Sequence, residues 1–244
     1  MMKHSRIAPL RRMMPIVVAL FVVVPVARSM EYFQGFDDLT LLPGEGWSFQ
    51  NLSDPPGTSW LQGNPLDFPA QAGPTDSFLA ASFLSGDGNA TISNWAITPT
   101  LTYSNGDTFK FYSRTRLNPA DAPDRLEVRL STAGSSADVG ASATSVGDFT
   151  TLLLTINPAL TTTGYPAVWT EYVVTLAGLA GPTEGRMAFR YFVTNGGPLG
   201  VNGDYIGIDT LSITSVPEPS TYALGSLGAC VLAFAGRRLR TKRT

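Results

Sequence analysis

The sequence predicts an all-β protein whose strands form one antiparallel β-sandwich. Short apolar segments recur through residues 30–215, several of them alternate apolar with polar residues, and Gly, Pro, Asn and Asp residues separate them. The chain has 24 Gly and 18 Pro among its 244 residues, and no stretch of this region has a convincing helical period. About nine strands in a region of this length favour a single sandwich domain.

The N-terminal segment 1–29 has the three parts of a signal peptide. A basic region ends at Arg11-Arg12, an apolar helix is expected at 13–26, and small residues, Ala27 and Ser29, follow. We therefore expect export through the Sec translocon and cleavage by signal peptidase after Ser29. The alternative, a permanent anchor, is less favoured because a membrane span needs about 20 apolar residues.

The C-terminal segment places a polar motif, an apolar helix and a basic end in that order. The motif is Pro217-Glu218-Pro219, and Arg237-Arg238 opens the basic end. The apolar residues 222–236 form a helix of about 22 Å, shorter than the hydrocarbon core of about 30 Å. Such a short transmembrane helix inserts when the bilayer thins or the flanking residues contribute. The basic end stays in the cytoplasm and leaves residues 30–216 outside.

This C-terminal order resembles the PEP-CTERM sorting signal. The resemblance implies an exosortase-type membrane peptidase as partner, transient anchoring in the inner membrane, and transfer to the cell surface or exopolysaccharide matrix of a Gram-negative bacterium. It divides the chain into a signal peptide (1–29), an exported domain (30–215) and a sorting signal (216–244). The alternative is a plain C-terminal anchor that follows a proline-rich linker.

The exported domain is acidic and lacks His and Cys. Residues 30–216 contain seven basic and 18 acidic residues, a net charge of −11. Such a surface repels nucleic acid and anionic lipid, so we expect no nucleic-acid partner. The single His, His4, and the single Cys, Cys230, lie in the terminal segments. Their positions exclude Ser-His-Asp or Cys-His catalysis, zinc ligation by His or Cys, and disulfides from the domain.

The first half of the domain should consist of short strands and one long loop. Residues 30–57 alternate loosely between apolar residues and turn formers. Residues 54–75 are rich in Pro and Gly, which favours a surface loop containing Trp60 and Phe68. Turns are expected at 85–89 and at Asn105-Gly106-Asp107. Strands are expected at 77–83, 91–97 and 108–115.

The second half contains the clearest strand, at 125–131. Its apolar face consists of Leu126, Val128 and Leu130, and its polar face of Arg125, Glu127 and Arg129. A loop of small residues follows at 133–147. On these exposed polar faces, arginines such as Arg114 and Arg116 should pair with acids on neighbouring strands. Further strands are expected at 149–156, 170–176, 186–193 and 205–213, with Met187, Phe189, Tyr191 and Val193 on one face.

Several motifs of the domain resemble the exported domains called choice-of-anchor J. They include Phe36-Asp37-Asp38, Asn94-Trp95 with Thr98-Pro99, Phe189-Arg190-Tyr191 and Gly207-Ile208-Asp209. These domains are related in shape to cleaved-adhesin and MAM-like jelly rolls. The resemblance therefore implies a jelly-roll sandwich at the cell surface, but it supplies no established activity.

Acidic residues near the two ends of the domain suggest a structural calcium site. Asp37 and Asp38 lie near the first strand and Asp209 in the last, and terminal strands of jelly rolls are often neighbours. Calcium takes six to eight oxygen ligands, and related adhesin-type domains carry it. Asp87 and Asn89 form a second, weaker oxygen cluster. The alternative is that these carboxylates cap turns.

The function predicted from these features is that of an exported surface or matrix protein, a non-catalytic structural, adhesive or glycan-binding module with exopolysaccharide as a candidate partner. Trp60, in the Pro/Gly-rich loop, is the ring proposed to stack on sugar, whereas Trp95 is expected in the core. The alternative is a secreted carboxylate-dependent hydrolase of polysaccharide. It needs two carboxylates about 5 Å or about 6.5–9.5 Å apart. No glycosidase motif is present, so no catalytic residues are assigned.

Overall fold

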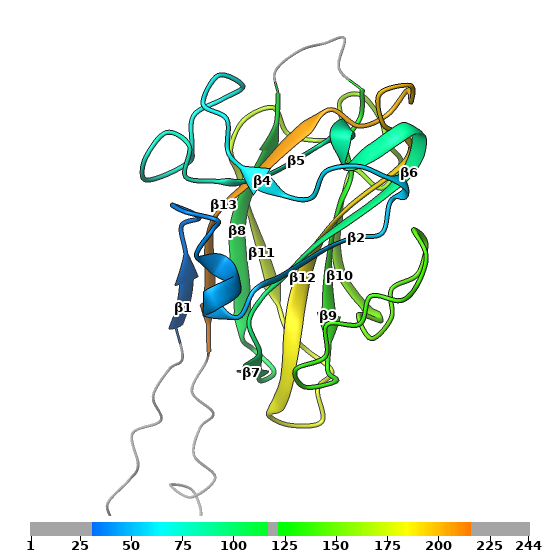
Figure 1. The fold of residues 1–244 in the computed structure, drawn as a ribbon. Coiled ribbons are helices and arrows are strands. Elements are labelled where there is room, and N and C mark those ends of the chain that lie inside the picture. The colour runs from blue at the N-terminus through cyan, green and yellow to red at the C-terminus, as the bar shows by residue number, and fades with distance from the viewer. Residues whose placement is uncertain (1–30, 117–121, 216–244) are drawn as a thin grey trace, which may run out of the picture. The chain divides into compact units, whose positions relative to one another are not determined.

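A computed structural model describes residues 31–116 and 122–215, and these form two antiparallel sheets packed face to face (Figure 1). Residues Ser29–Val216 make one compact unit. The signal peptide, the motif Pro217-Glu218-Pro219 and both apolar terminal segments lie outside the described residues. No helix in the two described ranges is long and apolar enough to cross a membrane.

The first sheet, sheet A, has the strand order β11-β8-β13-β5-β4, and β1 pairs with the C-terminal end of β13. The first and last strands are therefore neighbours, as expected, with Glu31 opposite Thr214. The strands of sheet A are β1 (Glu31–Gln34), β4 (Leu61–Gln62), β5 (Leu79–Ser82), β8 (Thr108–Thr115), β11 (Thr170–Thr175) and β13 (Tyr205–Thr214).

The second sheet, sheet B, has the order β10-β9-β12-β6-β2, with β3 paired to β6 and β7 to β12. Its strands are β2 (Ser48–Asn51), β3 (Asp54–Pro56), β6 (Gly86–Ile97), β7 (Leu101–Tyr103), β9 (Leu126–Ser131), β10 (Thr151–Ile156) and β12 (Thr183–Gly196). Two short 3-10 helices, η1 (Leu42–Glu45) and η2 (Phe83–Ser85), accompany the sheets. From β7 onward the chain crosses repeatedly between the sheets, so the predicted all-β jelly-roll sandwich is confirmed.

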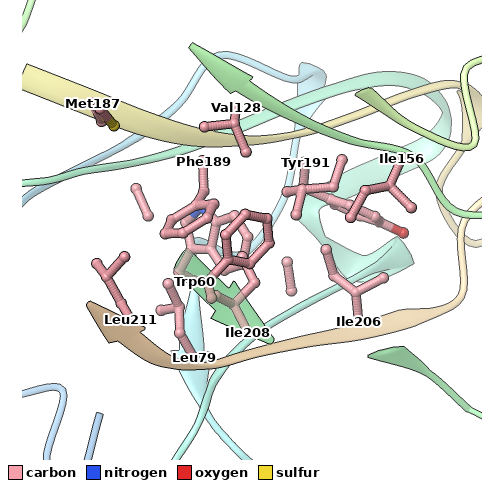
Figure 2. Packing of buried hydrophobic residues seen from close by; sticks show 14 of the residues in the cluster. Trp60, Leu79, Val128, Ile156, Met187, Phe189, Tyr191, Ile206, Ile208 and Leu211 are labelled. Carbon is pink, nitrogen blue, oxygen red and sulfur yellow. The ribbon is translucent and has the colours of Figure 1, made fainter. Parts of the chain in front are cut away.

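The core lies between the sheets and contains the faces that alternation predicted. Val128 and Phe189 of sheet B face Ile208 and Leu211 of sheet A (Figure 2). The ring of Phe189 lies 4.9 Å from that of Phe111, centroid to centroid. Both predicted apolar faces belong to this core: Leu126, Val128 and Leu130 on β9, and Met187, Phe189, Tyr191 and Val193 on β12.

Each sheet also has an outer face, and a connecting segment covers part of it. Residues 132–150, the cover segment, place Val139 and Phe149 against Trp95 on the outer face of sheet B. Residues 64–77 place Phe68 against Phe78 and Tyr205 on sheet A. Two predicted boundaries were wrong: the segment 54–75 contains β3 and β4, and Phe149 belongs to the cover segment rather than to β10.

Candidate functional site

The carboxylates predicted to hold calcium have separate hydrogen-bond partners. Asp38 Oδ1 accepts bonds from the amide and the hydroxyl of Thr40, at 2.9 and 2.6 Å, and these bonds lower its pKa. Asp37 Oδ1 accepts a 2.7 Å bond from the Ser77 hydroxyl. These are the turn-capping roles that were the alternative to metal binding.

Asp209 is fully buried and its carboxylate is surrounded by backbone amides. Oδ2 accepts the N–H groups of Gln71 and Ala72, at 2.7 and 3.1 Å, and Oδ1 accepts that of Thr210, at 2.6 Å. Burial nevertheless raises the pKa of Asp209 to about 6. Its oxygens thus fix residues 71 and 72 to β13 and do not face a common cation with the other two carboxylates.

No group of three or more His, Cys, Asp or Glu residues within 31–116 and 122–215 is arranged to hold a metal ion. The carboxylates present therefore do not fit a shared calcium site. Calcium binding by Asp37, Asp38 and Asp209 stays a prediction that these contacts do not support. The second cluster, Asp87 with Asn89, lies in the exposed first part of β6, where Asp87 Oδ1 accepts the amide of Gly88, so the turn predicted at 85–89 is wrong.

Trp60 does not present a ring for sugar stacking, which corrects the prediction for this residue. It is only 9% exposed and belongs to the core between the sheets, where Figure 2 shows it near Leu79 and Ile208. The reason is that Leu61 and Gln62 pair with β5, and this short strand directs the preceding ring into the sandwich. The Pro/Gly-rich composition predicted a loop but gave no information on the direction of the ring.

An open, amphipathic surface lies instead on the outer face of β8 and β11. On β8, Phe109, Phe111 and Ser113 face the core, so the alternate residues Lys110 and Tyr112 face outward. Glu171 lies opposite Tyr112 and Val173 opposite Lys110. We call this surface the outer strip; it consists of Lys110, Tyr112, Arg114, Trp169, Glu171 and Val173.

Polar contacts order the side chains at one end of the outer strip. The Tyr112 hydroxyl donates a 2.8 Å hydrogen bond to Glu171 Oε1, and Lys110 Nζ lies 3.4 Å from the same oxygen. The bond to Glu171 raises the pKa of Tyr112, and the same bond lowers the pKa of Glu171. The Lys110 and Glu171 side chains are 43% and 42% exposed, so this pair is open to ligand and solvent.

Aromatic packing fixes the other end of the outer strip. The Trp169 indole donates a 2.9 Å hydrogen bond to the Pro69 carbonyl and packs edge-on against Phe68, with ring centroids 5.5 Å apart. The guanidinium carbon of Arg114 lies 4.3 Å from the centroid of the Phe68 ring. A Cβ at Gly207 would lie 2.8 Å from both the Phe68 and the Trp169 ring, so only glycine permits this approach.

The outer face of sheet B is polar but covered. Arg190, only 1% exposed, donates from Nε to Ser93 Oγ at 3.0 Å, from Nη1 to Glu127 Oε2 at 3.1 Å and from Nη2 to the Ala143 carbonyl at 2.6 Å. Burial lowers its pKa to about 10. Arg129 Nε reaches the same Glu127 oxygen at 2.7 Å. Arg129 thus pairs with an acid of its own strand, β9, so its predicted pairing with a neighbouring strand and its predicted exposure are both wrong.

Of the other predicted arginines, one pairs with acids and two donate hydrogen bonds to backbone carbonyls. Arg116, just after β8, pairs with Asp67 at 3.1 Å and also contacts Asp204, and both acids lie in loops rather than on neighbouring strands. Arg114 donates instead to the Ala167 carbonyl, at 2.6 Å, and Arg125 to the Phe192 carbonyl, at 2.7 Å. These cations hold the loops in place, and they do not form a shared anion-binding cluster.

A half-open hollow of about 310 Å³ lies where β2 and β3 meet the cover segment. It is lined by residues 51–54, Pro56 and 141–143, and Asp54 is the only acid among them. A glycosidase needs two carboxylates on either side of the scissile bond. Asp209, the buried acid with the raised pKa, is not part of this lining. The hollow therefore lacks the carboxylate pair that the hydrolase alternative requires.

The C-terminal residues 215–240 match the family model described as the PEP-CTERM protein-sorting motif. This match confirms the predicted sorting signal, with Pro217, Glu218 and Pro219 inside the matched range. It indicates an exported protein that carries a C-terminal sorting signal. Among curated proteins, none matches the chain.

Solved structures show where else the fold occurs. The K1 cleaved adhesin domain of Lys-gingipain from Porphyromonas gingivalis W83 is 22% identical, with a TM-score of 0.51 over 77% of this chain and 99% of that domain. The K2 domain of Lys-gingipain is 23% identical, with a TM-score of 0.51 over 76% and 100% of the two chains. At these identities the likeness shows a shared fold, which confirms the predicted similarity to cleaved-adhesin domains. The choice-of-anchor J and MAM-like assignments stay predictions.

Proposed function

We propose that this chain is an exported, non-catalytic module that an exosortase-type peptidase processes at its C-terminus and that binds a neutral polysaccharide through the outer strip. The observation that carries the proposed binding is the open surface around Tyr112, where an aromatic ring lies next to charged side chains on a flat sheet. The proposed destination is the cell surface or the exopolysaccharide matrix, and the matched sorting motif supports it.

The chemistry of the outer strip suits a sugar chain. An aromatic ring offers an apolar face to the C–H side of a sugar, and it keeps its shape on binding because it has few rotatable bonds. Lys110, Glu171 and Arg114 supply donors and acceptors for hydroxyl groups next to that ring. A strip that is open along two strands also accepts an extended polymer, which a closed pocket does not.

The net charge of the domain favours a neutral polysaccharide over an anionic one as the ligand. Residues 30–216 carry a charge of −11, so a chain of uronates or sulfated sugars would be repelled over the whole surface. Within the outer strip, Lys110 is paired with Glu171, and the guanidinium of Arg114 donates to the Ala167 carbonyl. We therefore propose a neutral polysaccharide as the ligand.

The test is affinity electrophoresis of the exported domain in gels that contain neutral or uronate-rich polysaccharides. We expect retardation by a neutral polymer, and we expect Tyr112→Ala to weaken it about tenfold, the equivalent of about 1.4 kcal/mol. Leu152→Ala, at a half-exposed residue of β10, is the matched control and should bind like the wild type. Binding that is equal in wild type and Tyr112→Ala would reject the outer strip as the site.

The same samples test the hydrolase alternative. A non-catalytic module leaves the polymer intact, so no new reducing ends should accumulate after prolonged incubation. Release of reducing ends by the wild type would replace the proposed function with catalysis. Absence of retardation by every polymer would leave the fold and the sorting signal unchanged but would reject glycan binding.

A further inference from the structure

The exported domain contains two Asn-x-Ser/Thr triplets, the acceptor pattern of N-glycosylation. They are Asn51-Leu52-Ser53 and Asn89-Ala90-Thr91. The structure distinguishes them, because the Asn89 side chain is exposed at the start of β6 and the Asn51 side chain is hydrogen-bonded to three backbone carbonyls. We propose that Asn89 is an N-glycosylation site of this protein and that Asn51 is not.

Asn89 lies in the exposed first part of β6. Gly88, just before it, has a φ of +56°, and Asp87 Oδ1 accepts the Gly88 amide at 2.8 Å, so this part of the strand is ordered by its own residues. The Asn89 side chain is exposed, whereas Ala90 is buried in the core. Because side chains alternate along a strand, Asn89 and Thr91 both point away from that core.

The two reactive groups of the Asn89 triplet are available. Within the described residues, neither the Asn89 carboxamide nor the Thr91 hydroxyl takes part in a side-chain hydrogen bond. The neighbouring main chain is fixed without them, through the pairing of Ala90 with Gly196 and a 2.9 Å bond from the Leu199 amide to the Gly88 carbonyl. Attachment of a sugar to Asn89 Nδ2 therefore breaks no contact of the fold.

The Asn51 triplet has the opposite character. Asn51 Nδ2 donates to the carbonyls of Gly57, Thr58 and Ser85, at 3.2, 2.9 and 2.8 Å. Its Oδ1 accepts the amide and the hydroxyl of Ser53, at 3.0 and 2.6 Å. A sugar on Nδ2 would remove one of its two hydrogens and occupy the space of these carbonyls. The folded domain therefore excludes modification of Asn51.

The residues two positions before the triplets also favour modification of Asn89 over that of Asn51. Two positions before Asn89 lies Asp87, an exposed acid that gives a transferase a charged group to bind. Two positions before Asn51 lies Phe49, whose ring stacks on Trp47 with centroids 6.3 Å apart. The segment 87–91 thus combines charge, exposure and an unengaged acceptor, and the segment 49–53 has none of these.

The modification requires a donor of a defined class, an oligosaccharide linked through pyrophosphate to a polyprenyl lipid. A membrane oligosaccharyltransferase on the outer side of the inner membrane would catalyse the step. The bond between Asn89 Nδ2 and the anomeric carbon forms while the bond from that carbon to the pyrophosphate oxygen breaks. The lipid pyrophosphate leaves with the bonding electron pair, and Nδ2 gives up one proton to the transferase and keeps the other.

Asn89 and the outer strip lie on different sheets, so the two proposals are independent. Asn89 and Thr91 belong to β6 of sheet B, whereas Tyr112 belongs to β8 of sheet A. A glycan on Asn89 leaves polysaccharide binding by Tyr112 unaffected. Loss of one property without the other therefore shows which proposal has failed.

The test is expression of the full chain in a Gram-negative host that has an oligosaccharyltransferase and its lipid-linked oligosaccharide, with a known acceptor protein modified in the same cells. Cleavage before Asp residues yields the fragments 87–106 and 38–53, so mass spectrometry locates the two triplets on different peptides. We expect one oligosaccharide mass on fragment 87–106 and an unmodified fragment 38–53. A host without the transferase should yield both fragments unmodified.

Variants separate the chemistry from the fold. Asn89→Gln and Thr91→Ala should abolish the added mass, whereas Thr91→Ser should keep it and Asn51→Gln should leave it unchanged. The Asn89 side chain is exposed and makes no hydrogen bond within the described residues, so Asn89→Gln should unfold at the wild-type urea concentration. An unmodified wild type beside a modified acceptor, or an oligosaccharide on Asn51, would overturn the proposal.

Discussion

At the scale of single residues, two buried charged groups fix segments that carry no regular structure. Arg190 connects the cover segment to sheet B through the Ala143 carbonyl, and its guanidinium carbon lies 3.7 Å from the centroid of the Phe192 ring. Asp209 connects residues 71 and 72 to β13. Both groups hydrogen-bond to backbone groups of these segments, because the small residues there offer few side chains for packing.

Arg190→Met should destabilise the domain by about 3 kcal/mol. The substitution removes three hydrogen bonds and leaves Glu127 buried with Arg129 as its remaining cation. Lys110→Met is the matched control, because its pair with Glu171 is more than two-fifths exposed and should contribute under about 1 kcal/mol. Urea unfolding of both variants measures the difference, and equal losses would contradict the role assigned to Arg190.

Asp209 should make the domain less stable as the pH rises from about 4 to about 6. Its pKa in the folded protein is about 6 against 3.8 for an ordinary Asp, so the folded state binds the proton more tightly than the unfolded state. The stabilisation is complete below about pH 4 and is lost by about pH 6, with an upper limit of about 3 kcal/mol. Asp209→Asn should remove this part of the pH dependence.

The measurement for Asp209 is urea unfolding at several pH values between 4 and 7. Asp37→Asn is the control, because Asp37 bonds to Ser77, which belongs to the same segment 64–77 that Asp209 holds. The control should retain the wild-type loss of stability with rising pH, whereas Asp209→Asn should flatten it. Parallel curves for Asp209→Asn and the wild type would show that the carboxylate is already ionised at pH 4.

At the scale of elements, the cover segment decides which face of the sandwich is open. It places Phe149 on Trp95, with ring centroids 5.7 Å apart, and it encloses the charges of β9 and β12. On sheet A, residues 64–77 cover β13 and β5 but leave the outer side of β8 and β11 exposed. The outer strip is thus the part of sheet A that residues 64–77 leave uncovered.

Phe149→Ala should release the cover segment while the two sheets stay folded. Removal of this fully buried ring costs about 3–4 kcal/mol, and the segment has few other apolar contacts to replace it. Hydrogen exchange should increase in residues 132–150 and remain slow in β12. Leu152→Ala, at a half-exposed position, should change neither. A uniform increase in exchange throughout the domain would show that the cover segment unfolds only with the sheets.

The strands were predictable from the sequence, and the covered surfaces were not. Alternation assigned the core faces of β9 and β12 correctly, because apolar side chains that alternate along a strand lie on the face that is buried. It placed Glu127 and Arg129 on an exposed face, since alternation does not indicate whether a distant loop returns over a polar face. The same limit applies to Trp60, whose direction is set by pairing between Leu61 and Ala80.

Part of the outer strip is visible in the sequence. Trp169, Glu171 and Val173 alternate into the predicted strand at 170–176. That pattern places a tryptophan beside a charged residue on one face, which is the signal for an exposed aromatic surface. Pairing of this strand with β8, which brings Tyr112 beside Glu171, is a tertiary contact that one sequence does not encode locally.

At the scale of the whole molecule, a compact domain precedes the matched sorting motif. Residues Ser29–Val216 form a compact unit without His or Cys, so the domain depends on its core rather than on disulfides or zinc. The sorting motif begins where that unit ends. We therefore expect removal of the tail to change the location of the domain and not its fold.

In a host with an exosortase-type peptidase, the wild-type chain should lose its tail and leave the membrane fraction. Replacement of Pro217, Glu218 and Pro219 by alanine should block processing and leave the chain in the inner membrane, because the apolar helix and its basic end remain. Replacement of Ser220 and Thr221 is the matched control and should permit processing. Deletion of 217–244 should place the domain in the soluble exported fraction in any host.

Fractionation followed by intact mass measurement distinguishes these outcomes. The helix predicted at 222–236 is shorter than the hydrocarbon core by about 8 Å, so we expect a weak and temporary hold on the membrane. A processed chain should have the melting temperature of the deletion variant, because both contain the same domain. Wild-type protein that keeps residues 222–244 at the cell surface would identify the helix as a lasting anchor instead.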